Sequence, residues 1–351
     1  MSEPDIQLSI CIPAYNRGAT LPQLFDSIIA ELARVDDPDR VEVVVSDNAS
    51  ADDTPAVVER YRERLPNLTY VRQAENIGAD RNYLAVVEPA RGRFCWLMGS
   101  DDKVEDGALA RVLRATEQWS DTAGFCVNLA GYDSTFSRRI IMREAFTLDS
   151  DRLFEGADAI FQEFGPYYGY LSGQVIRRDL WNEVVATGEH LNFLNAYVHV
   201  FVIGRMIQKC PRWGYLHQRT VGWRSGNDSF IADGWYKRTS LDVVGYHDIS
   251  TALFGAGSKT ANVMRDRIAA VHAFTCLWTG KSQGQPAATL RKGARLLTRY
   301  YWRSPVYYYK LLPWILVPRP VARGAYLSYM KGVRPWVNAI RMRRNRKLAD
   351  W

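Results

Sequence analysis

The chain has 351 residues, enough to bury a large core in one elaborated domain or in one domain with a substantial appendage. Its five cysteines are scattered and lack CxxC spacing, so the composition indicates neither a disulfide framework nor a zinc site. The acidic N-terminal stretch has no signal-peptide pattern. We therefore expect a cytoplasmic protein.

The net charge of +7 is distributed unevenly. Residues 287–351 contain fifteen Lys or Arg and one acid, a net charge of +14, whereas residues 1–286 carry −7. A basic segment on an acidic body suggests a polyanionic partner, either a membrane surface or a nucleic acid. A solvated basic face is the alternative.

The first third of the chain alternates β-rich runs with amphipathic stretches. This pattern predicts an α/β fold with a central, mostly parallel sheet flanked by helices. Apolar residues recur at helical spacing from Leu21 to Leu32, after a plausible N-cap at Thr20. We expect strands at residues 7–13, 41–46, 68–72 and 93–98, and helices at residues 21–33, 53–65, 78–87 and 106–119.

Farther along, we expect strands within residues 123–142 and 170–177 and a helix at residues 190–208. From about residue 262, helices lead into a segment punctuated by prolines. The longest uncharged apolar runs are far shorter than the roughly 20 residues of a membrane-spanning helix. We therefore expect no membrane crossing.

Polar clusters follow three of the predicted strands, at residues 13–17 (PAYNR), 47–50 (DNAS) and 99–102 (GSDD). In open α/β sheets, ligands bind outside the carboxyl ends of the strands. The shared placement of the clusters predicts one ligand site.

Asp101 and Asp102 repel each other near a buried strand end, and a divalent cation would remove that cost. Oxygen ligands suit Mg²⁺ or Mn²⁺, which commonly bridge one or two carboxylates to a substrate diphosphate. The alternative is that one aspartate caps the helix expected near Asp106, or shapes a turn with Ser100.

Two further positions have both a functional and a structural interpretation. Asp47 can accept hydrogen bonds from a nucleotide base or from ribose, or form a turn with Asn48 and Ser50. In the segment 75–82, Gly78 suits a tight turn and Arg81 a phosphate or base contact. The alternative there is a helix start with an exposed arginine.

Four ordered motifs, LSICIPAYNR, VVVSDNASADDT, ENIGADRNY and WLMGSDD, resemble the successive motifs of family 2 glycosyltransferases with the GT-A fold. Such enzymes move a sugar from a nucleoside diphosphate donor to an acceptor, usually with Mg²⁺ or Mn²⁺ and with inversion at the anomeric carbon. The resemblance implies a catalytic domain at residues 1–230, with a nucleotide-sugar half (about 1–120) and an acceptor half (about 121–230). A helical region at residues 231–351 would follow.

The resemblance also implies roles for individual residues. Asp102 is the first choice as metal ligand, and Asp101 would serve metal or ribose. Gly99 stands where many relatives have the first acid of Asp-x-Asp-Asp. The implied nucleotide-sugar site comprises Pro13, Ala14, Tyr15, Arg17, Asp47, Asn76, Gly78, Arg81, Ser100 and Asp101.

Relatives commonly take the general base from a Glu-Asp pair at a helix start, and this chain lacks that pair. Matching Arg205 to the arginine that often follows it places His199 at the base position, where an imidazole can accept a proton near neutrality. A buried histidine in an apolar helix is the alternative, and Glu189 and His190 are further candidates. Arg224, in the loop-like cluster 223–228, suits a diphosphate.

The basic segment 287–351 interleaves its cations with aromatic rings, a composition that suits a bilayer headgroup region or stacking on nucleic-acid bases. An ordinary packed helical domain is another possibility. Because bacterial relatives often use polyprenyl-linked sugars, the resemblance favours peripheral association with the inner face of the cytoplasmic membrane and no nucleic acid. The rings are Tyr300, Tyr301, Trp302, Tyr307, Tyr308, Tyr309, Trp314, Tyr326, Tyr329 and Trp336.

We therefore expect a glycosyltransferase that acts on a surface-glycan or lipid-linked acceptor, similar to abequosyltransferase-like members that build O-antigen-type polysaccharides. The missing acidic pair motivates a non-catalytic nucleotide- or glycan-binding protein as the alternative. A nucleotidyltransferase would also pair carboxylates with a metal, but its Gly-rich basic loop is lacking. The donor, the linkage and the oligomeric state stay open.

Overall fold

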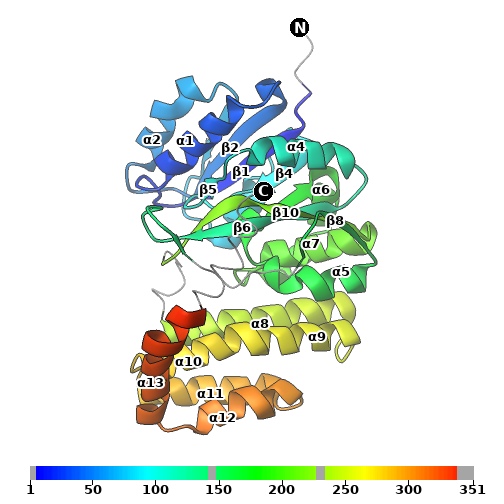
Figure 1. The fold of residues 1–351 in the computed structure, drawn as a ribbon. Helices are drawn as coiled ribbons and strands as arrows, with labels where there is room; N and C mark the ends of the chain where they lie inside the picture. Colours follow the sequence, from blue (N-terminus) through cyan, green and yellow to red (C-terminus); the bar gives the residue numbers. More distant parts are fainter. Residues whose placement is uncertain (1–4, 141–147, 227–233, 338–351) are drawn as a thin grey trace. The chain divides into compact units, whose positions relative to one another are not determined.

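The computed structural model describes residues 5–140, 148–226 and 234–337. These residues form two compact units (Figure 1). The first unit comprises the described residues up to 226 and is built around a sheet, whereas the second begins at residue 234 and is helical.

The first half of the sheet contains four parallel strands in the order β3-β2-β1-β4. They are β1 (Leu8–Ala14), β2 (Val41–Asp47), β3 (Leu68–Arg72) and β4 (Phe94–Leu97). Every residue of β1 and β2 is buried, as expected for parallel strands covered on both faces. The predicted strands of this region are confirmed to within a residue or two.

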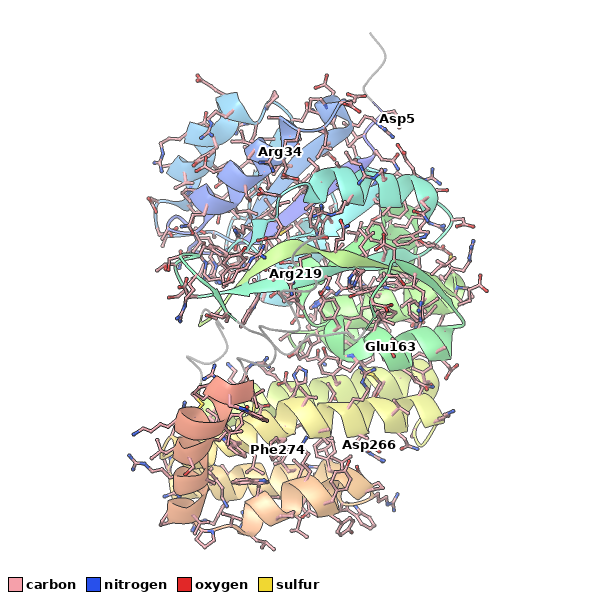
Figure 2. The ribbon with its side chains drawn as sticks, in the orientation of Figure 1. Asp5, Arg34, Glu163, Arg219, Asp266 and Phe274 are labelled. Atoms are coloured by element: carbon pink, nitrogen blue, oxygen red, sulfur yellow. The ribbon has the colours of Figure 1, made fainter. Side chains whose placement is uncertain are left out.

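The second half of the sheet is mixed. Strand β9 (Gln174–Arg177) runs antiparallel to both β4 and β6 (Gly124–Tyr132), and β10 (Arg212–Arg224) runs parallel to β6. The short strands β5 (Lys103–Val104), β7 (Arg139–Ile140) and β8 (Arg152–Glu155) pair antiparallel with β10 or β6. Figure 2 shows the side chains of the sheet, including Arg219 on β10.

The strand expected at residues 170–177 begins only at Gln174. Leu171–Gly173 form a 3₁₀ turn instead, and the indole Nε1 of Trp96 donates to the carbonyl oxygen of Ser172 at 2.9 Å. This turn becomes important for the site below. Of the expected strand region 123–142, the last two residues lie outside the described residues.

Seven α-helices among the described residues surround the sheet (Figure 1). The expected helix at residues 190–208 begins at Val198, because Glu189–Phe193 form a separate 3₁₀ helix. The helices are α1 (Leu21–Leu32), α2 (Thr54–Tyr61), α3 (Ala79–Ala85), α4 (Ala108–Gln118), α5 (Ala157–Phe164), α6 (Arg178–Ala186) and α7 (Val198–Lys209).

Two helix starts differ from the sequence expectation. Thr20 makes no side-chain cap on α1, and its hydroxyl donates instead to the carbonyl oxygen of Ser100 at 3.0 Å. The start of α4 is held by the buried carboxylate of Glu31, which accepts from the backbone N–H groups of Gly107 and Leu109. Glu31, rather than Asp101 or Asp102, therefore satisfies the backbone N–H groups at the start of α4. No side chain caps α4 from its N-cap position.

The second unit is a helical assembly, so the expected helical C-terminal region is confirmed. Its core contains Val243, Ala273, Leu277 and Leu297, and Phe274 at the start of α10 packs against it (Figure 2). In the described ranges, no helix has both the length and the apolar character needed to cross a membrane. The helices are α8 (Trp235–Phe254), α9 (Lys259–Ile268), α10 (Phe274–Ser282), α11 (Ala287–Tyr301), α12 (Leu312–Leu316) and α13 (Arg319–Ser328).

Candidate active site

Hydrogen bonds join the polar loops that follow β1 and β2. The backbone N–H of Asn16 donates to Ser50 Oγ at 2.8 Å, and the Asn16 side chain accepts from the N–H of Ala51 at 2.9 Å. The N–H of Arg17 donates to Thr54 Oγ1 at 2.8 Å. The two clusters therefore form one surface at the carboxyl ends of the strands, as the sequence predicts.

At this edge, Pro13 and Ala14 are the last two residues of β1, and both are buried. Tyr15 follows directly and is 44% exposed, and Arg17 is half-buried. The exposed ring of Tyr15 beside a buried strand end is available to a flat ligand such as a nucleotide base.

Asp47 ends β2 and is completely buried. Its Oδ1 accepts from the backbone N–H of Ser50 at 2.9 Å, and its Oδ2 accepts from the Tyr70 hydroxyl at 2.7 Å. The Nε of Arg72 lies 3.7 Å from the same Oδ2. The Ser50 contact matches the structural interpretation of Asp47 as a turn residue, and Tyr70 is a partner that the sequence reasoning missed.

The segment after β3 is tied to the same edge. Asn48 Nδ2 donates to Asn76 Oδ1 at 2.9 Å, and Gly78 takes a positive φ of 85° that favours glycine. The buried amide of Asn82 accepts from Ser46 Oγ at 2.7 Å. Asn76 and Gly78 therefore hold a third loop against the end of β2.

Arg81 lies on α3 and is exposed. It lines a cavity of about 640 Å³ together with Gln73 and the buried His190. The structure thus brings together Arg81 and one candidate base that the sequence placed more than a hundred residues apart.

The carboxylate of Asp102 is hydrogen-bonded through both oxygens, and only 4% of the residue is exposed. Its Oδ2 accepts from the hydroxyls of Tyr170 at 2.7 Å and Ser172 at 2.5 Å. Its Oδ1 accepts from the backbone N–H of Arg224 at 3.2 Å. Asp102 therefore joins the end of β4, the 3₁₀ turn before β9 and the end of β10.

Gly99 has a physical reason for lacking a side chain. A Cβ at this position would lie 3.1 Å from Ser172 Oγ and 3.2 Å from both Asp101 Oδ1 and Asp102 Oδ2. The N–H of Gly99 also donates to Ser172 Oγ at 2.8 Å. A third carboxylate would crowd the pair that is present.

Arg224 is the last residue of β10, so the expectation of a loop is wrong for Trp223 and Arg224. Asn227 and Asp228 of that cluster lie outside the described residues. The guanidinium donates from Nε to the carbonyl oxygen of Asp101 at 2.8 Å. Strand β10 thus places the Arg224 guanidinium beside the aspartate pair, although the residues are more than a hundred positions apart in the sequence.

Other groups fix the orientation of the Arg224 guanidinium. It donates to the carbonyl oxygen of Ser134 at 2.6 Å and to Gln23 Oε1 at 2.5 Å, and it lies 4.2 Å from the ring centre of Phe136. A guanidinium carries five N–H donors, and three of them serve these contacts and the Asp101 carbonyl.

Burial raises the pKa of Asp102 to about 7, and the negative charge of Asp101 adds to this effect. Hydrogen bonds from Ser172, Tyr170 and the Arg224 backbone oppose it. Adjacent oxygen donors of this kind fit a hard cation such as Mg²⁺ or Mn²⁺. No group of three or more metal-ligating His, Cys, Asp or Glu occurs among the described residues.

His199 is the second residue of α7 and is 2% exposed. Its ring packs edge-on to Tyr83, with 5.4 Å between ring centres. Burial lowers the pKa of His199 to about 4, although backbone groups of Tyr168 and Gly169 oppose the shift. Within the described ranges neither ring nitrogen has a hydrogen-bond partner. His199 is therefore a neutral imidazole beside the segment that supplies Tyr170.

The start of α7 is held by Asp80, which sequence reasoning missed. Its carboxylate accepts from the backbone N–H groups of Ala196 at 2.7 Å and Val198 at 3.1 Å, the arrangement in which an acid satisfies a helix start. Glu189 is half-exposed and pairs with Arg205 at 2.9 Å, so its charge is already compensated.

Comparison with known proteins supports this architecture. The family model described as Glycosyl transferase family 2 matches residues 9–180. The chain is 28% identical over 270 residues to abequosyltransferase RfbV of Salmonella typhimurium, covering 74% of this chain and 78% of that protein. It is 24% identical over 194 residues to the GalNAc(5)-diNAcBac-PP-undecaprenol beta-1,3-glucosyltransferase of Campylobacter jejuni, covering 54% and 60%.

Among solved structures, S. aureus TarS 1–349 in complex with UDP-GlcNAc has a similar fold, with a TM-score of 0.62 and 16% identity. The match covers 93% of this chain and 92% of that one. The sheet and its flanking helices match GT-A-type glycosyltransferase structures. The family model and the curated relatives support a glycosyltransferase of family 2, as the four motifs predicted.

The depressed pKa of His199 makes stability dependent on pH. The imidazole of His199 has a pKa near 6.5 in the unfolded chain and of about 4 in the folded chain. The free energy of unfolding therefore has its full value above pH 6.5 and decreases as the pH falls toward 4. We expect His199→Phe to remove this part of the acid sensitivity. Thermal melts of both proteins across this pH range test it, and parallel pH profiles would contradict the assignment.

Proposed function

We propose that the first unit transfers a sugar from a nucleoside diphosphate sugar to a saccharide acceptor in bacterial polysaccharide synthesis. The carrying observation is the buried Asp102 beside Asp101 at a strand end, where Arg224 is also held. The names of the relatives support a lipid-linked or surface-glycan acceptor, because one is an abequosyltransferase and another acts on an undecaprenol-linked glycan. The match to the glycosyl transferase family model and the named transferase relatives favour this enzyme over a non-catalytic binding protein.

In this proposal Asp101 and Asp102 would hold Mg²⁺ or Mn²⁺. The bound metal supplies charge stabilisation for the departing diphosphate. Asp102 is kept in place by Tyr170 and Ser172, so the site needs little rearrangement when the donor binds. The Arg224 guanidinium, held beside Asp101, would add a second positive charge for the diphosphate.

The nucleoside would lie over the ends of β1 and β2. Pro13, Ala14 and Tyr15 would form the wall of its pocket, and Asp47 would accept from the base or the ribose. Asp47 is buried at a strand end, and its Oδ2 accepts from a hydroxyl, that of Tyr70. A bound ligand would share or replace this hydrogen bond.

For the transfer step we assign the general base to His199. The acceptor hydroxyl would give its proton to a neutral ring nitrogen as its oxygen bonds to the anomeric carbon and the bond from that carbon to the diphosphate breaks. Direct displacement inverts the configuration at the anomeric carbon. A neutral imidazole carries a proton on one ring nitrogen, so the other nitrogen is the acceptor. Because burial lowers the pKa of His199 to about 4, the ring is a weaker base than the sequence leads us to expect.

Membrane association is the part of the proposal that concerns the second unit. Some of its aromatic rings belong to the core, namely Tyr301 and Tyr307. Others face solvent, with exposures of 56% for Tyr308, 68% for Tyr309 and 66% for Trp336. Exposed rings beside a strongly basic sequence suit an anionic headgroup layer. We infer peripheral association with the cytoplasmic membrane through this surface.

Asp101→Asn should weaken the effect of metal on nucleotide binding. In the native protein we expect Mn²⁺ to increase the affinity for a nucleoside diphosphate. In the variant we expect this increase in affinity to be smaller by about tenfold or more. Calorimetric titrations with UDP, GDP, CDP and dTDP, with and without Mn²⁺, provide the measurement. The control is Asp106→Asn, a nearby exposed carboxylate paired with Arg34. An unchanged metal effect in Asp101→Asn would refute the metal assignment.

His199→Gln should reduce the transfer rate by about a hundredfold or more, as loss of a general base typically does, while nucleotide affinity stays near the native value. Single-turnover assays with a nucleotide-sugar panel separate the two quantities. Glu189→Gln is the control, because the Glu189 carboxylate pairs with Arg205. Near-native turnover of His199→Gln, or a large loss in Glu189→Gln alone, would contradict the assignment.

The double variant Tyr308→Ser/Tyr309→Ser should sediment less with phosphatidylglycerol vesicles than the native chain, because two exposed rings are lost from the proposed surface. Val271→Ser provides a control, since this residue is an exposed apolar residue of the same unit. If the double variant sediments as the native chain does, this surface is not the membrane contact.

A further inference from the structure

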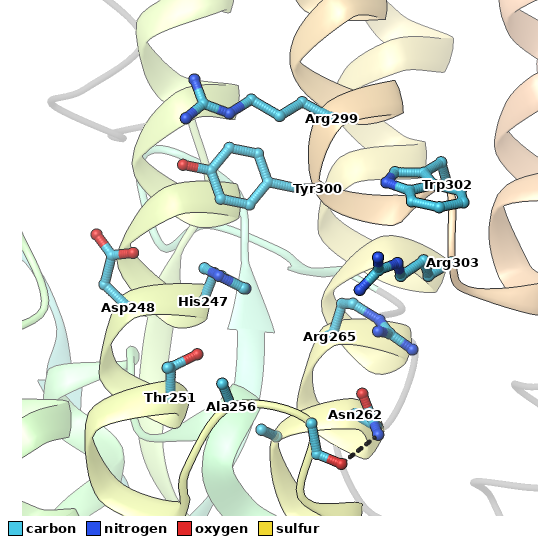
Figure 3. A pocket seen from close by; sticks show the side chains of 12 residues that line it. His247, Asp248, Thr251, Ala256, Asn262, Arg265, Arg299, Tyr300, Trp302 and Arg303 are labelled. Carbon is cyan, nitrogen blue, oxygen red and sulfur yellow. Dashed lines mark hydrogen bonds between the residues drawn. The ribbon is translucent and has the colours of Figure 1, made fainter.

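The second unit contains a cavity of about 790 Å³ between α8, α9 and the C-terminal end of α11 (Figure 3). Three arginines from two different elements line it, namely Arg265, Arg299 and Arg303. Asp248 is the carboxylate among its lining residues. The cavity thus has an excess of positive charge, and it lies outside the sheet-bearing unit that holds the glycosyltransferase site.

The charges of this cavity are incompletely compensated. Arg265 pairs with Asp266 at 3.1 Å, whereas Arg299 and Arg303 have no carboxylate partner in the part of the chain that the structure describes. These two arginines are four residues apart, at the end of α11 and just beyond it. The negative end of a helix accommodates one cation in its last turn but does not account for three around one cavity.

The two arginines without a carboxylate partner in the described ranges each lie beside an aromatic ring. The guanidinium carbon of Arg303 lies 4.7 Å from the ring centre of Trp302, and that of Arg299 lies 5.7 Å from the ring centre of Tyr300. Tyr300 in turn packs edge-on against His247, with 5.0 Å between ring centres. Figure 3 shows these side chains projecting from α11 and the turn after it, with Arg265 on the neighbouring helix. Both Arg299 and Arg303 thus have an aromatic neighbour.

We propose that this cavity binds a phosphate-bearing anion of the diphosphate class, held by the three arginines that line it, Arg265, Arg299 and Arg303. A guanidinium presents a planar fork of donors that matches phosphate oxygens, and orienting it in advance reduces the entropy lost on binding. Three cations against one lining carboxylate complement a ligand of more than one negative charge. The volume leaves room for a group attached to the phosphates, which Tyr300 and Trp302 would flank.

Two sources supply this chemistry, a phosphate carried by a lipid headgroup and a free phosphate compound. The proposal rests on the second unit alone, so it does not depend on the assignment of metal, base or donor in the first unit. Its test therefore uses binding as the readout, and failure of the transfer mechanism would leave it unaffected.

The experiment is a calorimetric titration of the full chain with inorganic pyrophosphate in the presence of EDTA. We expect Arg299→Gln/Arg303→Gln to weaken binding about tenfold or more, since two charge-assisted contacts are lost. The matched control is Arg291→Gln/Lys292→Gln, which removes the same charge from exposed positions of α11 that do not line the cavity. The double variant Arg299→Lys/Arg303→Lys keeps both positive charges, so it serves as the test if the glutamine double variant does not fold. Its affinity for pyrophosphate should lie between those of the native chain and the glutamine double variant.

A second arm identifies the source. Sedimentation with phosphatidylcholine vesicles that contain either phosphatidylglycerol or polyprenyl diphosphate should show binding that depends on Arg299 and Arg303 if the ligand is lipid-borne. Pyrophosphate binding without such vesicle dependence supports a free phosphate compound. The proposal is overturned if the native chain does not bind pyrophosphate, if Arg299→Gln/Arg303→Gln binds as tightly as the native chain, or if both glutamine double variants weaken equally.

Discussion

The hydrogen bonding of one buried carboxylate, that of Asp102, organises the catalytic unit. Tyr170 and Ser172 reach it from the turn before β9, and the backbone of Arg224 reaches it from the end of β10. The Asp102 carboxylate thus connects the mixed half of the sheet to the parallel half. A buried charge without such partners would cost several kilocalories per mole, so the contacts and the position of the carboxylate depend on each other.

This constraint also explains the local sequence. Gly99 keeps space for the Asp102 carboxylate and for Ser172, and any side chain there would meet both within 3.2 Å. The hydrogen bonds only partly offset burial and the charge of Asp101, because the pKa of Asp102 still rises to about 7. The residual cost is what a cation would relieve. A pair of like charges at a strand end is consistent with a site completed by its ligand.

The strand-end clusters were predictable because each lies within a few residues of a β-rich run, so local patterns place them. Tyr170 and Ser172 were not, since they contact Asp102 across about seventy residues of sequence and their segment reads as a strand. Arg224 was predictable as a phosphate-binding residue type, but its place on a long strand required knowledge of the sheet. Asp80 shows the same limit, because it serves the start of a helix more than a hundred residues away.

The central claim is that the Asp101–Asp102 pair holds a metal-bound donor diphosphate. Anomalous diffraction from crystals grown with Mn²⁺ and a nucleoside diphosphate tests it most directly. The account predicts an anomalous peak within coordination distance of an Asp101 or Asp102 carboxylate oxygen and of the diphosphate. A nucleotide bound at this strand edge with its diphosphate away from both aspartates, or a metal peak elsewhere in the chain, would contradict it.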